Sequence, residues 1–111
     1  MIYKILTRAE WDAALAAGAF IGSPVDVTDG YIHFSTAAQV RETAAKHFAG
    51  KTGLLLVAID PASLGDALKW EPSRGGALFP HLYAPLDPAL AVSVDELPWD
   101  GAAHVFPAAL A

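Results

Sequence analysis

The chain has 111 residues, of which 54% are hydrophobic and 17% charged, so it has enough apolar side chains for the core of one domain. Its formal net charge of −5 disfavours broad electrostatic binding of nucleic acid, which needs a basic surface. It contains no cysteine, which excludes a disulfide scaffold, a thiolate nucleophile and any metal site built on cysteine.

The first apolar segment is interrupted by Lys4 and Arg8, where a secretory leader needs an unbroken apolar stretch. The longest purely apolar run, residues 54–59, is far shorter than the ~20 residues that span a bilayer. We therefore expect a cytoplasmic protein without a membrane partner.

We expect a strand over residues 1–6, which are rich in Ile and Tyr. Thr7 and Glu10 form a capping-box pattern for a helix that ends near Gly18. The apolar face of that helix is expected to contain Trp11, Ala14 and Leu15. Residues 20–27 include a glycine and a proline, and we expect them to be irregular, with a turn after them.

A second strand is expected over residues 31–34. A T-x-x-Q capping box opens the helix predicted over residues 36–48, and Gly50 is expected to end it. Residues 54–59 form an unbroken apolar run, which indicates a buried strand.

Short strands are predicted over residues 68–71, 78–82 and 91–94, with loops or turns at residues 61–65 and 72–76 and an irregular tail after Leu97. Strands and two helices come first, and mostly strands follow. This order predicts a single α+β domain over residues 1–111, with a bent mixed or antiparallel sheet and two main helices.

The first cluster of polar residues lies in the second predicted strand. Because alternate side chains of a strand share a face, Tyr31, His33 and Ser35 are expected on one face and Ile32 and Phe34 on the other. Three hydrogen-bonding groups on one face can hold a polar ligand. The alternative is that the two apolar residues belong to the core while the polar face is simply in contact with water.

Two further clusters lie in the second half of the chain. Arg74 precedes two glycines, a combination that suits a phosphate or carboxylate, although the arginine can equally pair with Glu71 on the surface. His81 and Tyr83 are expected to share a strand face. Glu96, near the end of the last predicted strand, is a weaker candidate.

Other chemistries have no pattern in the sequence. No serine stands on the sharp strand-to-helix turn of a hydrolase nucleophile. The four histidines show none of the spacings typical of metal ligands, so no metal site is predicted.

Together, four motifs resemble a small bacterial family known only as a domain of unknown function. They are D-G-Y-I-H-F-S-T at residues 29–36, W-E at 70–71, S-R-G-G at 73–76 and F-P-H-L-Y at 79–83. The resemblance covers the chain from residue 2 to about residue 99.

That family is similar, at the level of the fold, to the ADP-ribosyltransferase-like superfamily, which has a split, bent α+β sheet and a cleft for NAD. The resemblance implies NAD as a candidate substrate. It implies that His33 contacts a ribose hydroxyl and that Tyr83 stacks on nicotinamide. It also implies that Glu96, or its rival Glu71, stabilises the cationic sugar as the N-glycosidic bond breaks.

We therefore expect a cleft for a nucleotide-like small molecule of the NAD or ADP-ribose type. Its expected ligand-binding residues are Tyr31, His33, Ser35, Arg74, His81 and Tyr83. One alternative is a non-catalytic ligand-binding or protein-interaction module. Another is phosphate transfer like that of the RNA 2′-phosphotransferases, in which His and Arg hold phosphate groups.

Overall fold

The computed structural model describes residues 1–110, except for the side chain of Arg74. The helices and strands follow in the order β1 (Ile2–Thr7), α1 (Arg8–Ala17), α2 (Pro24–Asp29), β2 (Ile32–His33), β3 (Ser35–Thr36), α3 (Ala37–His47), β4 (Leu54–Ile59), β5 (Leu68–Pro72), β6 (Leu78–Leu82) and β7 (Ala91–Glu96). Short 3-10 helices cover Pro61–Ala67, Arg74–Gly76, Pro88–Leu90 and Ala108–Leu110.

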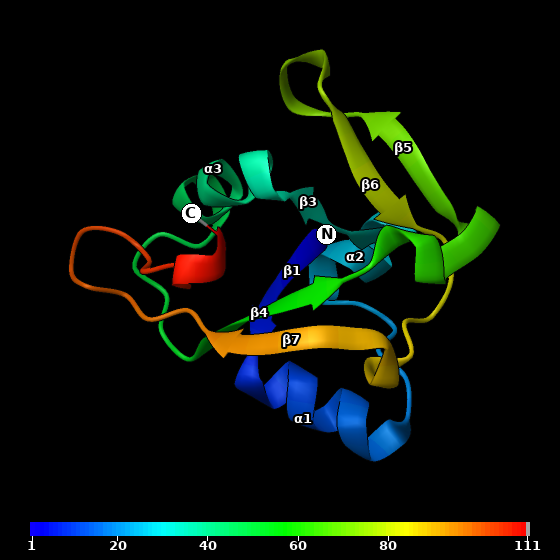
Figure 1. Cartoon of the computed structure of the whole chain (residues 1–111), viewed down its shortest axis with the longest axis horizontal. Helices are drawn as coiled ribbons and strands as arrows, with labels where there is room; N and C mark the ends of the chain where they lie inside the picture. Colours follow the sequence, from blue (N-terminus) through cyan, green and yellow to red (C-terminus); the bar gives the residue numbers. More distant parts are fainter. Residues whose placement is uncertain (111) are drawn as a thin grey trace.

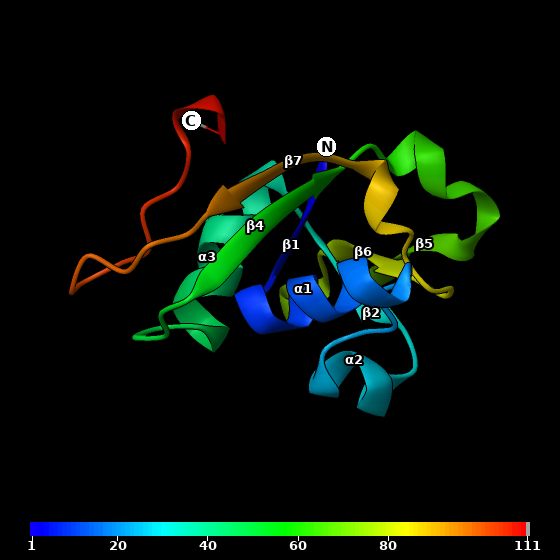
Figure 2. The same cartoon turned by 90° about the horizontal axis from the view of Figure 1, so that it is seen from below.

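The strands form two sheets, with the orders β3-β1-β4-β7 and β2-β6-β5. Every strand pair in the described part of the chain is antiparallel. Figure 1 shows the β5–β6 hairpin as an arm that projects beyond the larger sheet, and Figure 2 shows α2 and β2 on the side of the molecule opposite β7. The predicted α+β architecture is confirmed, and its sheets are antiparallel.

The two faces of the larger sheet pack against different partners, as the alternation of β1 shows. Ile2 and Leu6 join a core that includes residues of α1, β2 and β6, whereas Ile5 joins a second core beneath α3. Lys4 shares its face with Ile2 and Leu6 and is buried among them. A lysine in this position needs a buried partner, because an isolated charge in an apolar core is costly.

The first helix begins as the sequence predicts. Thr7 and Glu10 form the capping box, and Gly18 ends α1 in the left-handed conformation at a φ of 78°. Trp11 and Ala14 are buried, but the prediction for Leu15 is wrong, since its side chain lies in solvent. Leu15 directly follows Ala14, and adjacent residues of a helix point about 100° apart.

Residues 20–27 are not irregular throughout, which corrects the prediction, because α2 begins at Pro24. Proline suits the first helical position, where its missing N–H and fixed φ carry no penalty. Ser23 and Asp26 complete a capping box at this helix start. Proline destabilises the interior of a helix, but Pro24 stands in the first turn, where it does not, and the prediction ignored this difference.

The strand predicted over residues 31–34 is shortened to β2, and beyond Phe34 the chain forms a second short strand, β3, in the other sheet. β2 pairs with β6, while β3 pairs with β1. The backbone N–H of Phe34 donates to the carbonyl of Pro80 at 3.0 Å, so the chain leaves one sheet there and enters the other. Consequently His33 and Ser35 do not share one strand face.

The remaining elements match their predictions closely. β4 and β6 have the predicted bounds, and α3 ends at His47 with Phe48 as its C-cap, before the glycine expected to stop it. After β7 the chain is largely irregular, with an isolated bridge between Trp99 and His104 and a final 3-10 turn. In residues 1–110, no helix is both long and apolar enough to cross a membrane.

Candidate functional site

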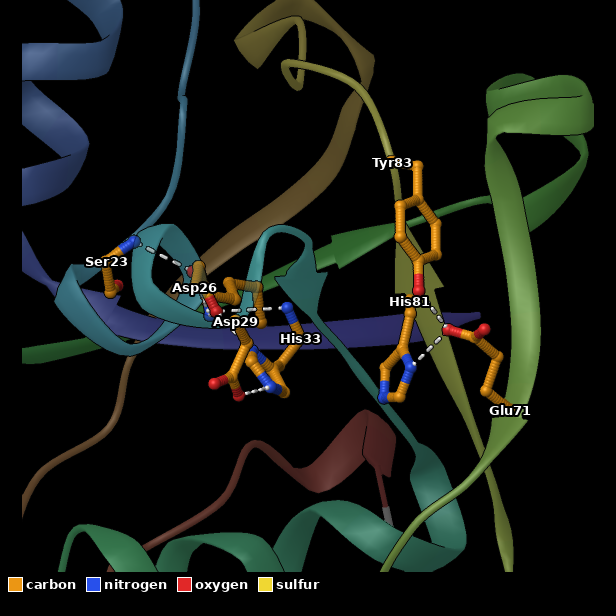
Figure 3. Close-up of polar contacts among 8 residues, drawn as sticks. Ser23, Asp26, Asp29, His33, Glu71, His81 and Tyr83 are labelled. Carbon is orange, nitrogen blue, oxygen red and sulfur yellow. Dashed lines mark hydrogen bonds and ion pairs between the residues drawn. The ribbon is translucent and has the colours of Figure 1, made fainter.

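The centre of the candidate site is Asp26, a buried carboxylate of α2 (Figure 3). Its Oδ2 accepts the backbone N–H of Ser23 at 2.8 Å and lies 2.8 Å from Nζ of Lys4. Its Oδ1 accepts both the backbone N–H of His33 at 3.1 Å and the ring Nδ1 of His33 at 2.6 Å. The lysine and the aspartate are thus each other's buried partner.

Electrostatics keep Asp26 ionised. Burial by itself raises the pKa of a carboxyl, but the hydrogen bond from His33 and the positive charge of Lys4 outweigh it and lower the pKa of Asp26 to about 2. The pKa of Lys4 is lowered, because burial outweighs the attraction of the aspartate. Lys4 and Asp26 thus form a buried ion pair beside the site, with Nζ and Oδ2 2.8 Å apart.

His33 connects this buried pair to the surface. Its side chain is 31% exposed, and its outer Nε2 lies 2.9 Å from Oδ2 of Asp29, the last residue of α2. Both ring nitrogens thus face carboxylate oxygens. Since carboxylates only accept, both contacts are hydrogen bonds when the ring carries two protons and a positive charge.

A second carboxylate–histidine pair lies on the β5–β6 hairpin. Oε1 of Glu71 accepts Nδ1 of His81 at 2.9 Å and the hydroxyl of Tyr83 at 2.7 Å. These hydrogen bonds from Tyr83 and His81 lower the pKa of Glu71, and the carboxylate raises the pKa of Tyr83 to about 12. His81 is buried, with 4% of its side chain exposed, whereas 38% of the Glu71 side chain is exposed.

The ring of Tyr31 lies between the two pairs. Its centroid is 4.7 Å from that of His33, 4.1 Å from that of His81 and 5.2 Å from that of Tyr83. The register explains this proximity, because His33 is the direct cross-strand partner of His81. Partial burial, and then the carboxylates of Asp29 and Glu71, raise the pKa of Tyr31.

An open hollow adjoins the cluster. It has a volume of about 390 Å³, and Tyr31 and Tyr83 lie in its wall together with Asp26. Ile21 and Val27 line it as well, although 72% and 61% of their surfaces are exposed. Neighbouring exposed apolar side chains are typical of a surface that binds something.

The structure brings together five of the residues predicted from the sequence. These are Tyr31, His33, Glu71, His81 and Tyr83.

Ser35 and Glu96 belong to other surroundings. Ser35 is buried on β3, where its hydroxyl lies 2.9 Å from that of Thr43 of α3. Glu96 ends β7 and forms an exposed ion pair with Arg8 at 3.1 Å. The backbone of Arg74 lies in the turn between β5 and β6, and its side chain is outside the described part of the structure.

Three residues of the cluster were not anticipated: Lys4, Asp26 and Asp29. The signal for Lys4 is its position between Ile2 and Leu6 on the inward face of a strand. The signal for Asp26 is its spacing from Ser23, S-x-x-D, at the start of a helix. Asp29 is the first residue of the motif at residues 29–36, which is its only mark in the sequence.

The arrangement can offer a hydrogen-bond donor at His33 and an acceptor at Glu71, on either side of an aromatic ring. Among residues 1–110, no group of three or more His, Asp or Glu side chains could hold a metal ion. The described side chains can supply hydrogen bonds, stacking and stabilisation of positive charge.

Residues 5–94 match the model of a family described as "Protein of unknown function (DUF952)". The crystal structure of protein CC0527 from Caulobacter crescentus is similar, with 51% identity, a TM-score of 0.94, and coverage of 98% of this chain and 96% of that one. The solution NMR structure of CC0527 shows 53% identity and a TM-score of 0.83, covering 93% of this chain and 89% of that one. No curated protein matched the chain.

Proposed function

Since the chain belongs to the DUF952 family, whose function is unknown, we propose a function from the geometry of the site: it binds a nucleotide-type ligand of the NAD or ADP-ribose kind. The observation that carries the proposal is the pair of carboxylate–histidine contacts on either side of Tyr31, one with its histidine exposed and the other with its carboxylate exposed.

The chemistry of a nucleotide suits this arrangement. A ribose hydroxyl both accepts and donates hydrogen bonds, so it can accept one from Nε2 of His33 and donate one to the carboxylate of Glu71. The rings of Tyr31 and Tyr83 border the open hollow, where a planar base or nicotinamide can stack on them. ADP-ribosyltransferase-like folds bind NAD, and the split into two antiparallel sheets supports that comparison.

Isothermal titration with ADP-ribose, NAD and nicotinamide tests the proposal. We expect ADP-ribose or NAD to bind the wild-type protein, and His33→Ala and Glu71→Gln each to weaken binding at least tenfold. His47→Ala, which removes an exposed histidine of α3, is the matched control and should bind as the wild type does. No binding by the wild type, or site variants that bind as tightly as the wild type, would contradict the proposal.

The state of Glu71 favours a second candidate, transfer of the ADP-ribosyl group from NAD. Hydrogen bonds from Tyr83 and His81 to Oε1 lower its pKa, and no described side chain occupies Oε2. A fixed carboxylate stabilises positive charge that develops at a sugar carbon.

In this reaction the bond from ribose C1′ to the pyridinium nitrogen breaks, and nicotinamide leaves with the electron pair. An acceptor hydroxyl or water then bonds to C1′ and releases its proton to solvent. Chromatography of NAD incubated with the protein should show nicotinamide, and Glu71→Gln should reduce its release about 100-fold. If the wild type binds NAD but releases no nicotinamide, the site is a binding site only.

A further inference from the structure

A continuous series of polar contacts leads from the core to the surface through Lys4, Asp26, His33 and Asp29. Figure 3 shows the last three of these residues. The first two residues are withdrawn from solvent, His33 is partly exposed and Asp29 is exposed. The four side chains therefore hold their contacts with very different strength.

The inner end of the series is fixed. Oδ1 of Asp26 accepts from the backbone N–H and the ring Nδ1 of His33, Oδ2 accepts from the backbone N–H of Ser23, and Nζ of Lys4 contacts both oxygens. Because Asp26 is ionised and buried, releasing any of these donors would leave a buried charge poorly satisfied. Nδ1 of His33 is thus committed to the core, and the orientation of the ring is set before any ligand arrives.

The outer end is easily exchanged. Asp29 is the last residue of α2, where the negative end of the helix dipole disfavours a carboxylate. Its side chain is 41% exposed, and exposed ion pairs between residues four apart contribute little to stability. The contact from Nε2 of His33 to Asp29 is the weakest in the series and the one that a ligand can reach.

We infer that Nε2 of His33 is the ligand-contacting atom of the site, that it donates to an oxygen of the ligand, and that Asp29 occupies this place until the ligand displaces it. The oxygen can be a hydroxyl, as in the ribose of the proposed function, or a phosphate oxygen. The inference rests on the proposed function for the identity of the ligand and on the geometry of His33 for the atom.

The test compares Asp29→Ala with Asp12→Ala, which removes the same charge from an exposed helical position on α1. Alanine is a good helix former, so both variants should fold. The probes are ADP-ribose and inorganic phosphate, and the readouts are isothermal titration and the ¹⁵N signals of the His33 ring.

We expect Asp29→Ala to bind ADP-ribose roughly two- to fivefold more tightly than the wild type, because the ligand no longer competes with an internal carboxylate. Asp12→Ala should leave the affinity unchanged. In both the wild type and Asp29→Ala, the ligand should shift the Nε2 signal of His33 and leave the Nδ1 signal in place, since Asp26 keeps that contact.

Weaker binding by Asp29→Ala would overturn the inference by showing that Asp29 contacts the ligand itself, and an effect equal to that of Asp12→Ala would overturn it as well. Failure of ADP-ribose and NAD to bind either protein would contradict the proposed function instead. In that case the titration with inorganic phosphate tests the inference. Phosphate must shift the ¹⁵N signal of His33 Nε2 at a lower concentration in Asp29→Ala than in the wild type, or the inference is wrong.

Discussion

The two carboxylate–histidine pairs of the site are arranged in opposite ways. In the first pair the carboxylate of Asp26 is buried and the ring of His33 reaches solvent, whereas in the second pair His81 is buried and Glu71 reaches solvent. The same two functional groups are in hydrogen-bonding contact both times, but the histidine is the exposed member on one side of Tyr31 and the carboxylate is the exposed member on the other. Which member is buried determines what each pair can do.

The pairs also differ in what holds them. Asp26 is tied to Lys4 inside the core, so the first pair is part of the packing that stabilises the domain. The second pair lies on the projecting β5–β6 hairpin (Figure 1), where Glu71 accepts hydrogen bonds from His81 of β6 and from Tyr83 just after it. Changes in the first pair should therefore reduce stability, and changes in the second should alter titration and binding.

The largest effect is expected from Asp26→Ala. Removing this carboxylate leaves Lys4 buried without a counter-charge, and breaking a buried pair in this way costs about 3–5 kcal/mol of unfolding free energy. Urea denaturation followed by circular dichroism measures the loss. The double variant Lys4→Met with Asp26→Ala is the control, and it should be more stable than Asp26→Ala alone. If the double variant instead loses as much stability as the two single variants together, Lys4 and Asp26 do not stabilise the fold as a pair.

Gly22→Ala should cost roughly 2 kcal/mol or more, because it strains the backbone and crowds the first pair. Gly22 has a φ of 124°, which side chains rarely adopt, and a Cβ there would lie 2.7 Å from Cβ of Asp26. Gly18→Ala is a useful comparison, since it shares the positive φ but a Cβ there meets nothing within 4 Å. The Gly22 variant should unfold at the lower urea concentration of the two.

Acid should weaken the first pair in a defined range of pH. The pKa of Asp26 is about 2 in the folded protein and near 3.8 when unfolded, so the unfolded chain binds the proton first as the pH falls. Asp26 therefore contributes about 2 kcal/mol of stability above that range, which is lost progressively as the pH falls from about 4 to about 2. As the pH falls through this range, the urea midpoint should decrease more steeply for the wild type than for Asp26→Asn. An equal decrease for the two proteins would contradict the assignment of this stability to Asp26.

The smallest change concerns the second pair. Glu71→Gln should move the urea midpoint little, because Glu71 lies on the surface, but it should change the titration of Tyr83. The carboxylate raises the pKa of Tyr83 to about 12, so the absorbance change of one tyrosine should come at lower pH in the variant. Tyr83→Phe identifies the signal, since it should remove that step from the wild-type curve. An unchanged curve for Glu71→Gln would show that the contact is absent in solution.

Much of the fold is predictable from short patterns in the sequence. The capping box at Thr7 and Glu10 and the apolar run of β4 specify their elements with local information alone. The division of the strand at Phe34 is not local, because it depends on which strand lies beside each residue. For that reason the alternation pattern correctly predicted that Tyr31 and His33 lie together, but its prediction that Ser35 lies beside them was wrong.

The site shows the same limit. His33, His81 and Tyr83 were found because they stand at alternate positions in apolar strands, a pattern that is visible in the sequence. The choice between Glu71 and Glu96 could not be made that way, since only the strand register shows which glutamate lies beside His81. Lys4 and Asp26 are separated by 22 residues in the sequence, and no local pattern predicts that two residues so far apart form a buried pair.

The pair formed by Lys4 and Asp26 also has a mechanical consequence. Lys4 belongs to the four-stranded sheet, and Asp26 holds His33 of the three-stranded one, so the ion pair fastens one sheet to the other beside the point where the chain crosses between them. His33, the donor side of the site, is therefore held rigidly by contacts that extend into the core. The acceptor side is carried by an edge strand on a hairpin. In the proposed binding site, adjustment to the width of a ligand would therefore come from that hairpin, while the ion pair beneath His33 would hold its place.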